Sequence, residues 1–89
     1  MRQQVLAWLI DWFVSKGRVK RQLLLDSLEK DYFEAGWLTS MEVVEFVTDL
    51  EQQFGIQLEE SDLQDARFLR LSGVSELVVE RSAQPAGNP

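Results

Sequence analysis

The sequence predicts a small all-α protein, a bundle of four helices with a long first loop and a short third helix. Apolar residues recur at helical spacing near the N-terminus, in the middle and near the C-terminus, whereas residues 22–38 lack such spacing. Val78-Val79 is the only β-like pair late in the chain and is too short to predict a strand. A chain of 89 residues with 45% hydrophobic side chains suits one domain with a single core.

The first helix is expected to run from residue 3 to about residue 15 and to end near Lys16-Gly17. Its apolar positions follow helical spacing and are Val5, Trp8, Leu9, Trp12 and Phe13. We expect Trp8 and Trp12 to lie in the core rather than to face a partner. The basic run from Gly17 to Arg21 would suit nucleic acid, but no aromatic residue interleaves with it and the chain is acidic overall. A solvated loop is therefore the prediction.

A long connection is expected over residues 22–38, with one short helical piece around Leu23 to Leu28. Apolar residues occur irregularly along it, at Leu24, Leu25, Leu28, Phe33 and Trp37. Irregular spacing suits a loop that is attached to the core at several points.

The second helix has a marked beginning and end. Thr39, followed three residues later by Glu42, predicts a capping box that places Ser40 in the first turn. Gly55 can adopt the left-handed conformation that ends a helix. Apolar residues fall on one side of this helix, at Val43, Phe46, Val47, Leu50 and Phe54. The acidic residues fall in a narrow arc almost opposite, at Glu42, Glu45 and Asp49.

The third helix is expected to be short. It begins at Ser61 or Asp62 and runs through Asp65 or Ala66, because polar residues that favour helix starts follow an apolar stretch. Core positions on either side of it are expected at Ile56, Leu58, Phe68, Leu69 and Leu71.

The final helix is expected to be capped by Ser72, and Gly73 in its first turn should weaken it slightly. Its buried side is expected to carry Val74, Leu77 and Val78, with Glu76 and Glu80 outside. Residues 82–89 are small and polar with two prolines, which predicts a disordered tail. We therefore expect one domain over residues 1–81 and a tail over residues 82–89.

Charge is distributed unevenly along the chain, whose net charge is −6. Residues 31–65 carry ten acidic and no basic side chains, and the segments on either side are net positive. An acidic block repels nucleic acid and anionic membranes and attracts basic protein surfaces. We expect neither nucleic acid nor membrane among the partners.

Composition excludes several kinds of site. The chain has no cysteine and no histidine, so disulfides, metal sites built on these residues and the common Ser-His or Cys-His nucleophile pairs are excluded. No metal site and no catalytic residue is predicted. The apolar run that begins at Val5 is interrupted by Asp11 and is too short for a signal peptide or membrane span, which predicts a cytoplasmic location.

The residues from Phe33 to Met41 carry a resemblance to a known family. They read Phe33-Glu34-Ala35-Gly36-Trp37-Leu38-Thr39-Ser40-Met41, and an acidic amphipathic helix follows. The segment resembles the carrier proteins of acyl, peptidyl and D-alanyl transfer, whose common pattern is Phe-x-x-Gly-x-x-Asp-Ser followed by Leu or Met. It looks nearest the D-alanyl and specialised acyl carriers. Thr39 stands where that family usually has an aspartate associated with recognition by the modifying transferase.

The resemblance implies a carrier-protein bundle and a non-enzymatic function. Ser40 would bear 4′-phosphopantetheine, attached covalently from coenzyme A, and the arm would hold an acyl or aminoacyl group as a thioester. Implied partners are a phosphopantetheinyl transferase, an acyl or aminoacyl loading ligase and downstream transferases with basic docking surfaces. The carried group is open among fatty acyl groups, polyketide intermediates, amino acids and D-alanine, and we expect a monomer. The partner surface is expected at Thr39, Met41, Glu42, Val44, Glu45 and Asp49.

Three alternatives remain open at this point. Asp26-Ser27-Leu28 matches the usual tripeptide better than the residues around Ser40, but no sustained apolar stripe follows Ser27, so Ser40 is preferred. A carrier-like scaffold that is never modified and binds proteins through the acidic helix is the second alternative, supported by Thr39. A small helical enzyme or regulator of unrelated type is the third.

Overall fold

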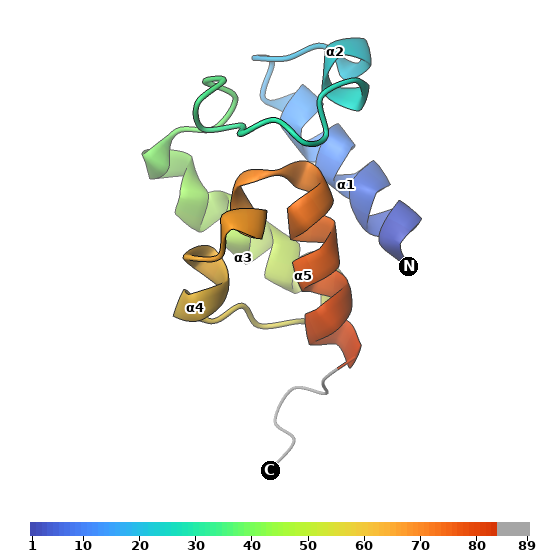
Figure 1. The fold of residues 1–89 in the computed structure, drawn as a ribbon, viewed down its shortest axis with the longest axis vertical. Coiled ribbons are helices and arrows are strands. Elements are labelled where there is room, and N and C mark those ends of the chain that lie inside the picture. Colours follow the sequence, from blue (N-terminus) through green and yellow to red (C-terminus); the bar gives the residue numbers. More distant parts are fainter. Residues whose placement is uncertain (84–89) are drawn as a thin grey trace.

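The structure is a computed structural model that describes residues 1–83, and these residues form helices and connecting loops (Figure 1). No strand occurs in this part of the chain. The predicted all-α class, with a long first loop and a short third helix, is confirmed. In chain order the elements are α1 (Arg2–Ser15), α2 (Arg21–Leu25), the 3₁₀ turn η1 (Ser40–Glu42), α3 (Val43–Phe54), α4 (Glu60–Leu63), the 3₁₀ turn η2 (Ala66–Leu69) and α5 (Leu71–Ala83).

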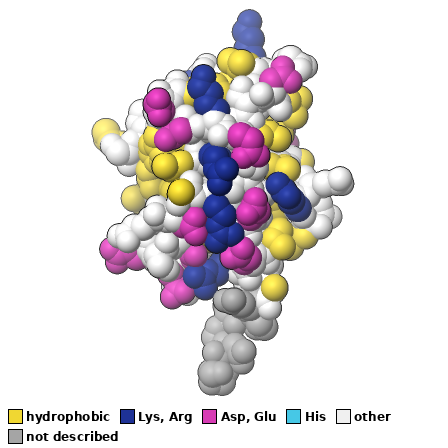
Figure 2. All heavy atoms as spheres, viewed as in Figure 1, with side chains coloured by type: hydrophobic (Ala, Val, Ile, Leu, Met, Phe, Trp, Pro, Cys, Tyr) yellow, Lys and Arg dark blue, Asp and Glu magenta, His cyan; other side chains and the backbone are white. Residues whose placement is uncertain are grey.

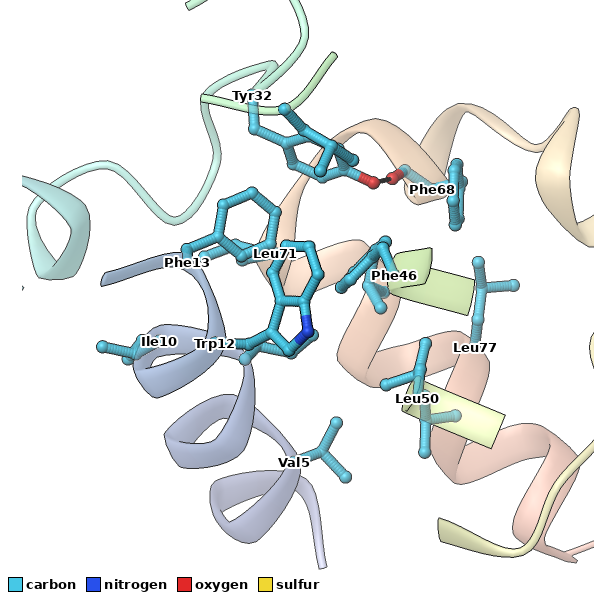
Figure 3. Packing of buried hydrophobic residues seen from close by; sticks show 14 of the residues in the cluster. Val5, Ile10, Trp12, Phe13, Tyr32, Phe46, Leu50, Phe68, Leu71 and Leu77 are labelled. Carbon is cyan, nitrogen blue, oxygen red and sulfur yellow. Dashed lines mark hydrogen bonds between the residues drawn. The ribbon is translucent and has the colours of Figure 1, made fainter. Parts of the chain in front are cut away.

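The centre of the core is a cluster of aromatic rings that joins four separate segments (Figure 3). Phe13 of α1, Tyr32 of the long loop and Phe46 of α3 contact one another, with ring centroids 5.1 to 6.1 Å apart. Phe68 of η2 lies 6.1 Å from Phe46 and 6.3 Å from Tyr32. Such pairs add about 0.5–1.5 kcal/mol each beyond the area that they bury, so the cluster holds the helices and the loop together.

The two tryptophans of α1 lie at different depths. Trp12 is buried and its ring centroid is 4.9 Å from that of Phe46, as expected for a core residue. Trp8 is only partly buried and meets the edge of Phe54 at the end of α3, 5.7 Å between centroids. The prediction that both lie in the core is therefore confirmed for Trp12. Trp8 lies at the edge of the core and is only partly buried.

The long first loop is attached to the core mainly by Tyr32, which the spacing of apolar residues did not single out. Its side chain is fully buried, its hydroxyl donates to the carbonyl of Phe68, and its amide donates to the carbonyl of Leu69 at 3.1 Å. Leu25, expected as an anchor, is 45% exposed. Leu24 lies on the buried side of α2. Because successive residues of a helix point about 100° apart, the next residue, Leu25, is directed toward solvent.

The short third helix begins earlier than expected. Glu59, not Ser61 or Asp62, is its N-cap, and the Glu59 amide donates to the Asp62 carboxylate at 2.9 Å. Asp62 is buried and also accepts from Arg81 of α5, at 2.7 Å from Nε and 3.0 Å from Nη2. The helix stops at Leu63, and η2 starts after Asp65, whose carboxylate accepts from the Arg67 amide at 2.9 Å.

The start of α5 also differs from the prediction. The helix begins at Leu71, so Ser72 is not its cap; Ser72 is buried within the first turn, and its amide donates to the carbonyl of Leu28 at 3.1 Å. The helix continues to Ala83 and therefore includes residues 82 and 83, which the sequence placed in the tail. The rest of the predicted tail, residues 84–89, lies outside the described residues.

Charges of both signs are mixed over the face drawn in Figure 2, where basic side chains lie among acidic ones. Among the ion pairs of the fold, Arg67 contacts Asp65 at 3.0 Å and Glu80 at 2.5 Å. None of the described helices is both long enough and apolar enough to span a bilayer.

Gly73 is required by a close backbone approach between η2 and α5. A Cβ at this position would lie 2.1 Å from the Arg67 carbonyl oxygen and 2.6 Å from the Arg67 Cα. The sequence indicated only that this glycine weakens the helix, whereas its missing side chain is what allows the two segments to touch.

The substitution Gly73→Ala is therefore expected to lower the free energy of unfolding by roughly 1–3 kcal/mol through steric overlap. In an ordinary helix the same change would raise stability by about 1 kcal/mol. Urea denaturation followed by circular dichroism gives the sign directly. A variant more stable than the wild type would contradict the close approach.

Candidate functional site

The chain leaves the core immediately before Ser40. Trp37 and Leu38 retain only 7% and 2% of their accessible surface, whereas Thr39 and Ser40 are exposed. The Trp37 amide donates to the Tyr32 carbonyl at 2.9 Å, which ties this point of the loop to its main anchor. Two buried residues therefore fix the place where Ser40 reaches the surface.

The helix start around Ser40 is capped by Thr39 and Glu42, which form the predicted capping box. The Thr39 amide donates to Glu42 Oε1 at 3.0 Å, and the Thr39 hydroxyl lies 3.1 Å from the same oxygen. The first turn is a tight 3₁₀ turn and regular α-helix follows from Val43. The other end is also as predicted, because Gly55 adopts φ 63° and ends α3.

The first turn presents Ser40 to solvent with backbone amides that have no helical acceptor. The amides of Ser40 and Met41 precede the first full turn, where partners are missing in any helix and partial positive charge accumulates. The Glu42 carboxylate is directed to Thr39 and to Arg18, whose Nη1 lies 2.5 Å from Oε1. A negatively charged ester on the Ser40 hydroxyl would therefore meet favourable backbone dipoles.

Arg18 also sets the protonation of Glu42. Its hydrogen bond, together with that from the Thr39 amide, lowers the pKa of Glu42 from 4.5 to about 2. The carboxylate is thus ionised at neutral pH and is held in the cap.

The predicted acidic site residues of η1 and α3 face the chain's own α1 and the loop after it, which the sequence did not predict. Lys16 Nζ lies 2.8 Å from Glu45 Oε2, and Trp12 Nε1 donates to Asp49 Oδ2 at 2.9 Å. With the Arg18 contact to Glu42, each predicted acidic site residue has a partner within the chain. Glu45 remains exposed, whereas Glu42 and Asp49 are partly buried.

Two apolar residues beside Ser40 are open to solvent. Met41 is 90% exposed and Val44 is 74% exposed, more than any other large hydrophobic side chain described in residues 1–83. The sequence placed them at the edge of the buried stripe, whereas both side chains are open to solvent in the fold. Thr39, Ser40, Met41, Val44 and Glu45 thus share an exposed surface at the start of the helix.

Ser27, the alternative serine, has a different setting. It is partly buried in a turn after α2, where its amide donates to the Leu24 carbonyl at 3.0 Å and its carbonyl accepts from the Lys30 amide at 3.0 Å. No long helix starts there in the described chain. The geometry thus keeps the preference for Ser40.

Sequence reasoning missed Lys16 and Arg18 as neighbours of the acidic residues. The available signal was charge, because a basic segment precedes an acidic block that lacks any basic side chain. That signal indicates attraction but not which pairs form.

Acidification is expected to loosen the cap. Because folding lowers the pKa of Glu42, its pairing contributes stability at pH values above 4.5, and this contribution is lost as the pH falls through about 2. Carboxyl-carbon NMR titration should place the Glu42 midpoint near 2 and should move it upward in Arg18→Gln. An unchanged midpoint in that variant would show that Arg18 does not hold the carboxylate.

Comparison with known proteins agrees with the resemblance carried by residues 33–41. Residues 18–78 match a family model described as a phosphopantetheine attachment site. No curated protein and no solved structure matches the chain. The matched segment covers more than half of the 89 residues and includes Ser40 and all of α3. The chain therefore belongs to the phosphopantetheine attachment site family, whose domain bears a covalently attached 4′-phosphopantetheine group.

Proposed function

We propose that Ser40 is the attachment residue and that the protein carries an acyl or aminoacyl group to partner enzymes. The observation that supports this most is the position of Ser40, exposed in the first turn of an amphipathic helix within the family match. Its hydroxyl would attack the pyrophosphate of coenzyme A, release adenosine 3′,5′-bisphosphate and retain 4′-phosphopantetheine as a phosphodiester. We infer that this bundle acts as one carrier domain, in the cytoplasm and as a monomer.

The residues around Ser40 fit such a group. The first-turn amides of Ser40 and Met41 favour a phosphodiester, and the Glu42 carboxylate is held by Thr39 and Arg18. The bound arm supplies the thiol that the polypeptide lacks, on which cargo is held as a thioester. The protein's own residues orient the hydroxyl and present the surface that partners recognise.

Partner enzymes would include a phosphopantetheinyl transferase, a loading ligase and downstream transferases. Met41 and Val44 offer an apolar contact immediately beside Ser40, and methionine adapts to surfaces of different shape. Glu45 is the most accessible of the predicted acidic residues and suits basic docking groups. An arm on a small domain lets one tethered substrate meet several enzymes at high effective concentration.

A second candidate is an unmodified scaffold that binds proteins through the same surface. Thr39, in place of the family's usual aspartate, favours it, because that aspartate is associated with recognition by the transferase. The exposed Met41 and Val44 would serve such a scaffold equally well.

Incubation with coenzyme A and a broad-specificity phosphopantetheinyl transferase is expected to add one phosphopantetheine group at Ser40. Intact mass gives the increment and peptide fragmentation gives its position. Ser40→Ala should abolish the increment, and Ser27→Ala should leave it unchanged. A folded wild-type protein without an increment would favour the unmodified scaffold, and an increment lost in Ser27→Ala would move the site to Ser27.

Substitutions at Thr39 separate its two roles. Thr39→Ala should lower the free energy of unfolding by about 1 kcal/mol through loss of the cap. Thr39→Asp retains a capping oxygen and is expected to raise the rate of arm transfer, measured by mass spectrometry over time. An unchanged or slower rate in Thr39→Asp would show that threonine is not a defect in the recognition site.

A further inference from the structure

The acidic face formed by Glu42 of η1 and Glu45 of α3 is occupied by a short basic segment of the same chain, which we define as Lys16, Gly17 and Arg18. Arg18 lies 2.5 Å from Glu42, and Lys16 lies 2.8 Å from Glu45. These pairs join residues 24 and 29 positions apart in the sequence. The contacts are thus a feature of the tertiary fold and not of one helix.

The basic segment is fixed at both ends. Lys16 caps α1, with its amide donating to the Phe13 carbonyl at 3.1 Å, and its ammonium lies 4.5 Å from the centre of the Trp12 ring. Gly17, at φ 79°, turns the chain back toward α3. Val19 follows and is buried. The two cations are therefore held beside α3 before any partner arrives.

A partner that approaches Glu42 and Glu45 through its own lysines or arginines meets these two cations first. Such a partner must either displace Lys16 and Arg18 from these carboxylates or dock on a part of the surface that the two cations do not cover. Exposed ion pairs are weak, so displacement is feasible, but it removes part of the gain from a purely electrostatic encounter. Apolar contact with Met41 and Val44 is not opposed in this way, because both side chains are open to solvent.

We propose that Lys16 and Arg18 determine partner specificity by competing with a partner's cations for Glu45 and Glu42. The partners selected are protein surfaces that combine an apolar contact for Met41 and Val44 with basic groups strong enough to replace the internal pairs. This inference rests on the proposed function, in which the start of α3 is the docking surface.

The test uses Lys16→Gln/Arg18→Gln and a control variant with the same change in charge, Arg2→Gln/Lys20→Gln. Arg2 and Lys20 are exposed, and the described chain shows no ion pair for either. Arm transfer by a broad-specificity phosphopantetheinyl transferase is measured as kcat/KM at low and high salt. Circular dichroism confirms that both variants are folded.

We expect kcat/KM of the Lys16→Gln/Arg18→Gln variant to rise roughly three- to tenfold at low salt, because Glu42 and Glu45 are released from two partly exposed ion pairs. The control should change less, and the difference should shrink at high salt because exposed charges are screened. Equal changes in the two variants would show an effect of net charge alone and would overturn the proposal. No change in either variant would overturn it as well.

A second measurement keeps this result separate from the proposed function. A synthetic amphipathic helix of lysine and leucine is titrated against the unmodified proteins, and its dissociation constant is measured by isothermal titration calorimetry. Tighter binding to Lys16→Gln/Arg18→Gln than to the control supports competition at α3, and equal binding overturns it. If no variant is modified with phosphopantetheine but the peptide still binds Lys16→Gln/Arg18→Gln more tightly than the control, the proposed function is wrong. The competition of Lys16 and Arg18 for the acidic face is then still supported.

Discussion

Burial of Tyr32 is the constraint on which the rest of the structure depends. Ordering a long loop costs conformational entropy at every residue, and this loop has only one short helix to offset it. Tyr32 contributes ring contacts to α1, α3 and η2, and its hydroxyl and amide satisfy two carbonyls at the end of η2. The Trp37 amide is hydrogen-bonded to the Tyr32 carbonyl, so Tyr32 also fixes the position at which the chain reaches the surface before Ser40.

Electrostatic compensation is the second organising feature. The acidic block of residues 31–65 would repel itself if it were isolated, but the fold places basic residues from both flanks against it. Lys16 and Arg18 reach α3 from the N-terminal side, and Arg81 reaches Glu59 and Asp62 from the C-terminal side. Several carboxylates of the acidic block are thus paired within the chain, and the surface beside Ser40 includes the exposed apolar side chains of Met41 and Val44.

Local signals in the sequence predicted local structure well. The cap at Thr39, the end at Gly55 and the periodicity of α1 each depend on a few neighbouring residues, and all three are confirmed. Contacts between distant segments were not predictable in this way. Tyr32 carries a polar group that finds its acceptor only in the folded chain, and Gly73 is explained by a backbone contact with Arg67. The pairing of the acidic face with Lys16 and Arg18 is missed for the same reason.

The exposure of Met41 has a consequence for redox chemistry. A thioether that is 90% exposed is accessible to oxidants, and oxidation to the sulfoxide turns an apolar side chain into a polar one. The change would fall one residue from Ser40, on the surface that partners are proposed to cover. The chain has no cysteine and two methionines, of which Met41 is the more exposed, so Met41 is the most accessible sulfur of the polypeptide. Oxidation of Met41 would therefore change the chemistry of the surface beside Ser40 without changing the serine itself.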